Sequence, residues 1–259
     1  MITWNVFPWF AAASALLWAA GAVAALRSSK YSKTAFLLTC AGLCVYVAFV
    51  AGLWISLQRP PLRTQGETRL WYSFFLMLCG ALTYRRWHYK WILLLSALLT
   101  VVFVAMNLLK PELHDSSLMP ALQSYWFVPH VTVYIFSYSV FGCAFLLALA
   151  SIARHSDRYL PTIDRLVCIG LAFLTLGMLS GSLWAKEAWG YFWSWDPKET
   201  WAAVTWFLYL LYLHLRLYRK AGCGWCGTLL LAAGFVCMQM CWYGVNYLPS
   251  AQGSMHAYY

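Results

Sequence analysis

The sequence predicts an all-α protein, a bundle of about eight helices that cross a lipid bilayer. Of its 259 residues, 63% are hydrophobic and only 10% are charged, whereas soluble domains are about half apolar and about a quarter charged. So few charged residues cannot coat a soluble particle of 29.6 kDa, and lipid is therefore expected to cover most of the surface. The apolar residues form long runs without the alternation of a membrane-spanning strand, which favours helices over a barrel.

A helix that crosses a bilayer core about 30 Å thick needs roughly 20 apolar residues. Eight segments come close to this length, and the third is the shortest. The first lacks a preceding basic segment and is too long for a signal peptide, so we expect it to be retained. The connections are short, which indicates one membrane domain over residues 1–259. The eight segments are residues 5–26, 34–57, 70–84, 91–109, 126–153, 163–186, 200–218 and 225–245.

Cytoplasmic loops of membrane proteins collect Lys and Arg, and here these residues divide twelve to six between the two sides of the bundle. The division predicts that both termini lie outside. The net charge of +10 is spread in short groups between apolar runs, so it indicates topology and not a nucleic-acid partner. The twelve on the expected inner side are Arg27, Lys30, Lys33, Arg85, Arg86, Lys90, Arg154, Arg158, Arg165, Arg216, Arg219 and Lys220, and the six on the outer side are Arg59, Arg63, Arg69, Lys110, Lys186 and Lys198.

The expected outer loop between the sixth and seventh segments, residues 187–200, is rich in aromatic residues. Six of the thirteen residues that begin at Trp189 are aromatic. Trp and Tyr rings favour the headgroup region, so the loop fits an aromatic belt. A second interpretation stays open, because Gly190 permits a tight turn and Trp193 and Trp195 alternate with a serine. That order fits a flat aromatic shelf for a large planar ligand.

Two acidic residues, Asp196 and Glu199, close this loop. Their spacing permits acid–base chemistry by a carboxylate pair, but Asp-Pro-x-Glu before an apolar run is also typical of a helix start with Asp as the N-cap. We therefore expect a capping role for both. Lys186 and Lys198 flank the loop, and both snorkelling to the interface and pairing with ligand carboxylates fit them.

Three of the six histidines stand out by their position. His130 begins the fifth segment and His256 follows the last one, so both are expected on the outer face near the aromatic loop. Neutral imidazole is a common ligand of haem iron, although a lone histidine at a membrane boundary is more often an interfacial side chain. His214 lies eighteen residues beyond Asp196, roughly 27 Å along one helix, so we expect it near the inner side.

Nine cysteines are present, and most lie in apolar segments, where a free thiol packs as a small hydrophobe. Cys223 and Cys226 have the spacing of a redox pair. No βαβ pattern surrounds them, so chance spacing is the favoured interpretation.

The run 189–201, with Pro-Lys-Glu directly after its Asp, resembles the WWD motif of haem-handling membrane proteins and, within them, the CcsA/ResC type of System II cytochrome c synthase. Residues 120–126, ahead of His130, and residues 253–258, around His256, are similar to the segments that flank the external histidines of that family. The first part of the chain is similar mainly in its pattern of spans.

The resemblance implies a haem-handling subunit of a cytochrome c synthase, with haem b as substrate and bound ligand. Its partners would be a CcsB/ResB-type membrane subunit and an apocytochrome c, whose Cys-x-x-Cys-His motif receives the haem. Two external histidines would hold the iron of an outer haem, and an embedded histidine would hold an inner haem with a ligand from the partner. On this resemblance the outer iron ligands are His130 and His256, the inner one is His214, and the remaining site residues are Trp189, Gly190, Trp193, Trp195 and Asp196.

Two other functions would use the same residues. One is export or delivery of haem without ligation, which the sequence does not separate from synthase activity. The other is electron transfer by a bis-histidine haem subunit, which fits less well because its histidines should lie within facing helices. We expect the bacterial cytoplasmic membrane, with the aromatic loop on the periplasmic side, in preference to a thylakoid membrane.

Overall fold

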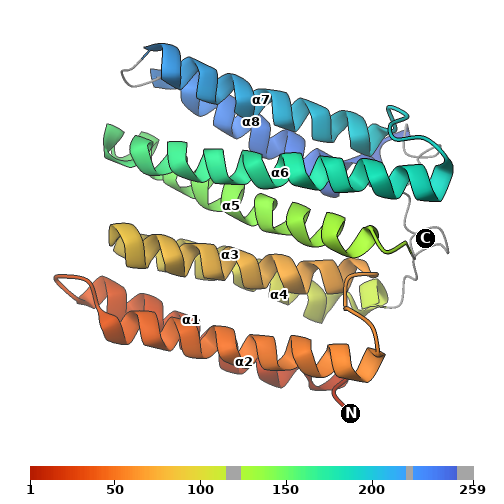
Figure 1. Cartoon of the computed structure of the whole chain (residues 1–259). Coiled ribbons are helices and arrows are strands. Elements are labelled where there is room, and N and C mark those ends of the chain that lie inside the picture. Colours follow the sequence, from red (N-terminus) through yellow and green to blue (C-terminus); the bar gives the residue numbers. More distant parts are fainter. Residues whose placement is uncertain (115–123, 220–223, 250–259) are drawn as a thin grey trace. The chain divides into compact units, whose positions relative to one another are not determined.

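The computed structural model describes residues 1–114, 124–219 and 224–249, and regular structure in these ranges is helical (Figure 1). Each of the eight predicted segments coincides with a helix, which confirms the all-α fold. The helices are α1 (Phe7–Arg27), α2 (Lys33–Leu57), α3 (Gln65–Trp87), α4 (Lys90–Leu109), α5 (Phe127–Ala153), α6 (Leu160–Trp189), α7 (Pro197–Arg219) and α8 (Gly224–Trp242). Short 3₁₀ turns are η1 (Trp4–Val6), η2 (Pro111–His114), η4 (Asp157–Tyr159) and η5 (Gly244–Tyr247).

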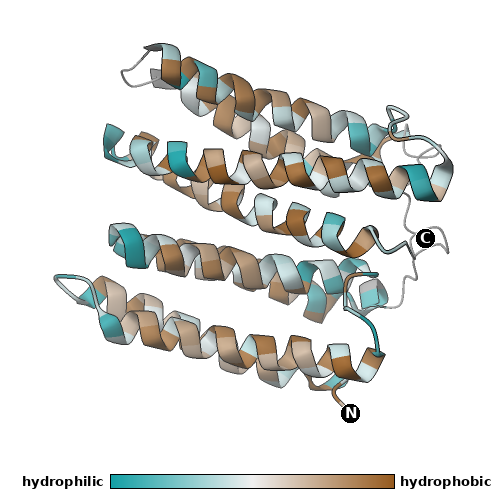
Figure 2. Cartoon of the chain, in the orientation of Figure 1, coloured by the Kyte–Doolittle hydropathy of each residue, from teal (hydrophilic) through white to brown (hydrophobic). Residues whose placement is uncertain are grey.

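Five of the described helices are long and apolar enough to cross a membrane by length and composition. They are α2, α4, α5, and α1 and α6 together with the turns that precede them. α8 contains a shorter apolar stretch, Cys226–Trp242. Hydrophilic residues gather toward helix ends and hydrophobic residues cover the lengths between them (Figure 2), as expected for helices whose sides face lipid.

α3 is longer than the predicted segment 70–84, because it runs from Gln65 to Trp87. Its first turn contains Glu67 and its last turn contains Arg85 and Arg86. Polar residues at both ends lower the hydropathy there, although the backbone stays helical. Capping, described below, sets the true start of the helix.

The helices form two compact units, Met1–Ser117 and Leu118–Tyr259. In the N-terminal unit α1 packs on α2 and α4, and α3 packs on α2 and α4. In the C-terminal unit α5 packs on α6 and α8, and α7 packs on α6 and α8. Each unit is thus a four-helix arrangement in which helices that follow one another in sequence are neighbours in space.

Glycines let helices of the N-terminal unit approach each other closely. A Cβ atom at Gly42 of α2 would lie 2.6 Å from the indole of Trp18 in α1. Trp18 is fully buried and its ring lies 5.5 Å from that of Tyr46. Small residues at crossing points are typical of membrane helix pairs, because packing and not the hydrophobic effect holds such helices together.

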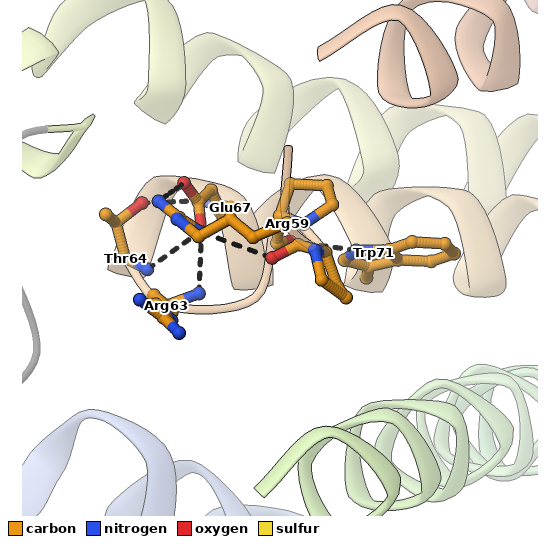
Figure 3. Close-up of polar contacts among 7 residues, drawn as sticks. Arg59, Arg63, Thr64, Glu67 and Trp71 are labelled. Carbon is orange, nitrogen blue, oxygen red and sulfur yellow. Dashed lines mark hydrogen bonds and ion pairs between the residues drawn. The ribbon is translucent and has the colours of Figure 1, made fainter. Parts of the chain in front are cut away.

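The connection between α2 and α3 is organised by one buried carboxylate, that of Glu67 (Figure 3). Thr64 and Glu67 form a capping box, in which the Glu67 N–H donates to Thr64 Oγ1 at 3.1 Å and the Thr64 N–H donates to Glu67 Oε2 at 3.2 Å. The Arg63 N–H also donates to Oε2, at 2.6 Å. Arg59 adds a two-point ion pair with nitrogen–oxygen distances of 3.0 and 2.8 Å.

Arg59 and Trp71 extend this cluster to the preceding loop. One Arg59 guanidinium nitrogen donates to the Pro60 carbonyl at 3.1 Å, and the Trp71 indole N–H donates to the Pro61 carbonyl at 2.9 Å. The carboxylate of Glu67 therefore fixes both the start of α3 and the path of the chain that leads into it.

Replacing Glu67 by Ala should destabilise the protein by about 2–4 kcal/mol, because it leaves two backbone N–H groups and the Arg59 guanidinium without their acceptor. The measurement is the melting temperature of the full chain in detergent. Glu112→Ala, which removes an exposed carboxylate in η2, is the matched control and should change stability by less than about 0.5 kcal/mol. Equal effects of the two substitutions would contradict the assigned role.

Candidate functional site

The aromatic loop begins where Gly190 ends α6. Gly190 has a φ of 90°, in the left-handed region that glycine adopts without strain, and its N–H donates to the Lys186 carbonyl at 3.1 Å. A Cβ atom at Gly190 would meet nothing within 4 Å, so backbone conformation and not space requires glycine. The Lys186 ammonium donates back to the Gly190 carbonyl at 2.7 Å. The tight turn predicted at Gly190 is therefore confirmed.

The loop ends in the predicted cap of α7. The Lys198 N–H donates to Asp196 Oδ1 at 3.0 Å, and the Asp196 N–H donates to Glu199 Oε2 at 3.2 Å. The same Glu199 oxygen accepts from the Ser194 N–H at 2.8 Å. Both acidic residues are at least nine-tenths buried. Their carboxylates hold the loop and start the helix, as the sequence predicted.

Trp193 and Trp195 of the loop do not form the flat shelf that the sequence suggested. The rings of Trp193 and Trp195 have centroids 5.7 Å apart and an interplanar angle of 87°. Trp195 has a φ of 60°, which costs a bulky residue conformational energy, and 68% of its surface is exposed. Alternation in sequence does not make two rings coplanar, because the backbone turns between them. The two rings instead form a T-shaped pair, in which the ring of Trp195 is exposed.

His130 lies in the first turns of α5, against α6. Its Nδ1 atom is 2.9 Å from the carbonyl oxygen of Gly177. Its ring lies over the ring of Trp184, with centroids 5.6 Å apart and an interplanar angle of 23°. Trp184 is 2% exposed and contacts Trp189 edge-on at 4.8 Å. A continuous row of rings therefore joins His130 to the residue at which the aromatic loop begins.

A second row of rings joins His130 to the end of α8. Tyr134 lies 4.7 Å from His130, Tyr138 lies 5.6 Å from Tyr134, and Trp242 lies 6.0 Å from Tyr138, all between ring centroids. The thiol of Cys241, next to Trp242, donates to the Lys198 carbonyl at 3.3 Å. The start of α5, the end of α6, the start of α7 and the end of α8 thus meet at one end of the C-terminal unit.

The Lys198 side chain is half-buried at this end, in the first turn of α7 and ahead of the apolar stretch 200–218. Desolvation by burial lowers the pKa of Lys198 to about 8, although Cys241 and Asp196 act in the opposite direction. The ammonium is thus costly to keep charged, which is unusual for a surface lysine.

His214 lies on α7, eighteen residues beyond Asp196, and is exposed. Its Nδ1 atom is 2.9 Å from the Leu210 carbonyl of its own helix. Nearby, Asp164 of α6 pairs with Arg216 at 2.8 Å and accepts from the Tyr212 hydroxyl at 2.7 Å. His214 therefore does not join the end of the unit that holds His130.

The remaining predicted ligand, His256, lies outside the described residues, as does Cys223. That His256 and His130 bind the same haem iron stays a prediction. Within the ranges that the structure describes, no group of three or more His, Cys, Asp and Glu side chains is placed to hold a metal ion. For haem this is no obstacle, since its iron takes only axial ligands from the protein.

Trp184 belongs to the tryptophan-rich region that the sequence places on the same face as His130, whereas the roles of Gly177 and Gly181 in holding the His130 ring were not predicted. A Cβ atom at Gly181 would lie 2.6 Å from the His130 ring. The available signal was the spacing of Gly170, Gly177 and Gly181 along an apolar segment, because small residues at such spacing mark a close helix contact.

Comparison with known proteins identifies the family. The family model described as "Cytochrome C assembly protein" matches residues 63–251, which include the whole of this end of the C-terminal unit. The chain belongs to that family. The CcsA-type resemblance is thereby confirmed, and family membership supports a role in cytochrome c biogenesis.

Several relatives of this family member are named "Cytochrome c biogenesis protein CcsA". The protein of Chlamydomonas reinhardtii is 38% identical over 62% of this chain and 48% of its own length. The protein of Solanum tuberosum is 31% identical over 80% of this chain and 82% of its own length. The chain thus spans about half of the algal relative and most of the other.

A solved structure, named "Cytochrome c Heme Lyase CcmF", has the same fold. It superposes with a TM-score of 0.73 at 18% identity, and the match covers 93% of this chain and 46% of that one. At this identity the likeness concerns the fold. It supports a helical membrane architecture for this cytochrome c assembly protein.

Lys198→Met should raise the melting temperature of this family member at neutral pH by about 2–4 °C. Below a pH of about 8 the folded chain holds a desolvated ammonium, whereas the unfolded chain keeps its proton up to about 10.5. The advantage of Lys198→Met should therefore shrink as the pH rises through 8, because the wild-type lysine then loses its proton in the folded state.

Lys198→Arg is the matched control, since its guanidinium stays charged throughout. Its difference from Lys198→Met should not change with pH. A pH-independent difference between Lys198→Met and the wild type would contradict the buried-ammonium interpretation.

Proposed function

We propose that this chain is the haem-handling subunit of a cytochrome c synthase. The subunit brings haem to the outer face of the membrane and presents it for attachment to an apocytochrome c. The observation that supports this most directly is the end of the C-terminal unit, where His130 is joined through Trp184 to Trp189 and the aromatic loop. Family membership supports the same role.

The residues at this end suit a haem substrate in three respects. His130 supplies an imidazole for the iron, held by a backbone carbonyl. Exposed apolar rings, Phe192 at 54% and Trp195 at 68%, offer surface to a porphyrin. Lys186 and Lys198 lie on either side of the loop and are suited to the haem carboxylates. His256, in the C-terminal tail, is proposed as the second axial ligand.

The bond-forming chemistry belongs to the haem and the apocytochrome, and the protein orients them. Each cysteine thiol of the Cys-x-x-Cys-His motif adds across one vinyl group, so that sulfur bonds to one vinyl carbon and the thiol proton ends on the other. No electrons are lost or gained in this addition. The capped loop, fixed by Asp196 and Glu199, keeps the aromatic rings in place while the apocytochrome approaches.

An inner haem site is proposed at His214, shared with a histidine of a CcsB/ResB-type partner. Its exposure on α7, away from the end that holds His130, supports a role at a subunit contact. Haem would pass from this site to the outer one. The proposed location is the bacterial cytoplasmic membrane with the aromatic loop on the periplasmic side.

Co-expression with a ResB-type partner and an apocytochrome c tests the proposed activity. Wild type should give haem that stays on the cytochrome after denaturation, and His130→Ala should lower this covalent haem about tenfold or more, because one axial ligand is lost. Leu149→Ala is the matched control, since Leu149 is an exposed residue near the other end of α5.

If the wild-type complex carries haem but all haem on the cytochrome can be extracted, synthase activity is contradicted, and export or delivery of haem is indicated. Unchanged haem content in His130→Ala would contradict the outer site itself.

His214→Ala should separate the inner site from the outer one. Covalent attachment of haem made inside the cell should fall about tenfold, and haem supplied to the outer face of spheroplasts should restore it. Leu211→Ala, an exposed neighbour on α7, is the control and should behave as wild type. Failure of outside haem to rescue His214→Ala would contradict a separate inner site.

A further inference from the structure

The contact between α5 and α6 repeats every seven residues, and His130 occupies one step of that repeat. The Ser137 hydroxyl donates to the Gly170 carbonyl at 2.8 Å. Seven residues earlier on α5 and seven later on α6, His130 Nδ1 lies 2.9 Å from the Gly177 carbonyl. In both pairs a polar side chain of α5 contacts the carbonyl oxygen of a glycine in α6. The register of the two helices therefore sets the position of His130.

A carbonyl oxygen accepts hydrogen bonds and donates none. The nitrogen that faces it must therefore carry the ring proton. In a neutral imidazole a proton on Nδ1 leaves the lone pair on Nε2, so the backbone contact selects the nitrogen that can bind a metal. Partners of this kind fix the tautomer and the orientation of metal-binding histidines and raise their basicity.

Glycine is required on α6 for the ring to reach this position. A Cβ atom at Gly181 would lie 2.6 Å from both Cε1 and Nδ1 of His130. Two aromatic rings also contact the imidazole. Trp184 stacks on it with ring centroids 5.6 Å apart, and Tyr134 lies tilted against it at 4.7 Å. The imidazole is thus held by the contact of Nδ1 with a carbonyl and by two neighbouring rings.

We infer that Gly177 and Gly181 are positioning residues that hold His130 as the Nδ1–H tautomer and direct its Nε2 atom to haem iron. The direction toward haem rests on the function proposed above, whereas the tautomer and the ring position are properties of the protein alone. Gly177 acts through its carbonyl oxygen, which also accepts from the Ser180 hydroxyl at 3.1 Å, and Gly181 acts through the absence of a side chain.

Nitrogen NMR of the full chain, labelled with ¹⁵N-histidine and prepared without haem, tests the tautomer directly. Signals of His130 are identified by their loss in His130→Gln. The expected result is a protonated Nδ1 and an unprotonated Nε2 at a pH where the ring is neutral. A proton on Nε2 would overturn the inference, whether or not the protein binds haem.

Gly181→Ala tests the position of the ring, with Gly234→Ala as the matched control. Both add a methyl group to a helix of the C-terminal unit against an aromatic ring, but Gly234 lies on α8 and the ring it would meet is that of Tyr209 on α7, at 3.0 Å. Gly181→Ala should shift the His130 signals, leave those of His214 unchanged, and lower haem retention about 10- to 100-fold, whereas Gly234→Ala should stay within about twofold of wild type.

The outcomes distinguish this inference from the proposed function. A wild type with the Nδ1–H tautomer that binds no haem would overturn the function and leave the tautomer standing. If the wild type binds haem, and Gly181→Ala and Gly234→Ala have identical NMR signals and haem retention, the positioning role of Gly181 is overturned and the proposed function stands.

Discussion

The C-terminal unit depends on the close approach of α5 and α6 at glycines. Lipid offers no hydrogen bonds, so a polar side chain in this region needs a partner inside the protein. Ser137 and His130 find theirs in the carbonyls of Gly170 and Gly177. The same glycines leave room for the rings of α5, and the register that satisfies the polar groups therefore also decides where His130 stands.

Both units use a buried glutamate to hold the loop before their third helix. Glu67 gathers the Arg63 and Thr64 N–H groups and the Arg59 guanidinium ahead of α3. Glu199 gathers the Ser194 and Asp196 N–H groups ahead of α7. In each case one carboxylate accepts hydrogen bonds from backbone N–H groups at and just before the N-cap of the helix. The aromatic loop is held at both ends as a result, by this cap and by Gly190.

These two constraints meet at the end of the C-terminal unit. The helix register fixes the imidazole, the cap fixes the aromatic loop, and the buried indole of Trp184 connects them. His214 stands apart, exposed on α7 with its own helix as hydrogen-bond partner. The proposed outer haem site therefore rests on a histidine held between α5 and α6, and the proposed inner site rests on an exposed histidine of α7.

The sequence by itself determined the membrane-helical fold, the segments that become helices, the turn at Gly190 and the cap formed by Asp196 and Glu199. These depend on composition and on contacts between residues near one another in the chain. Its motif also led to the family. The start of α3 was missed because polar capping residues lie outside an apolar run.

Only the tertiary structure decided the perpendicular arrangement of Trp193 and Trp195 and the seat of His130 on Gly177, Gly181 and Trp184. The contacts of His130 with Gly177, Gly181 and Trp184 join residues about fifty positions apart. The register of two packed helices and the path of a turning loop determine them, and the chemical identity of the residues alone does not.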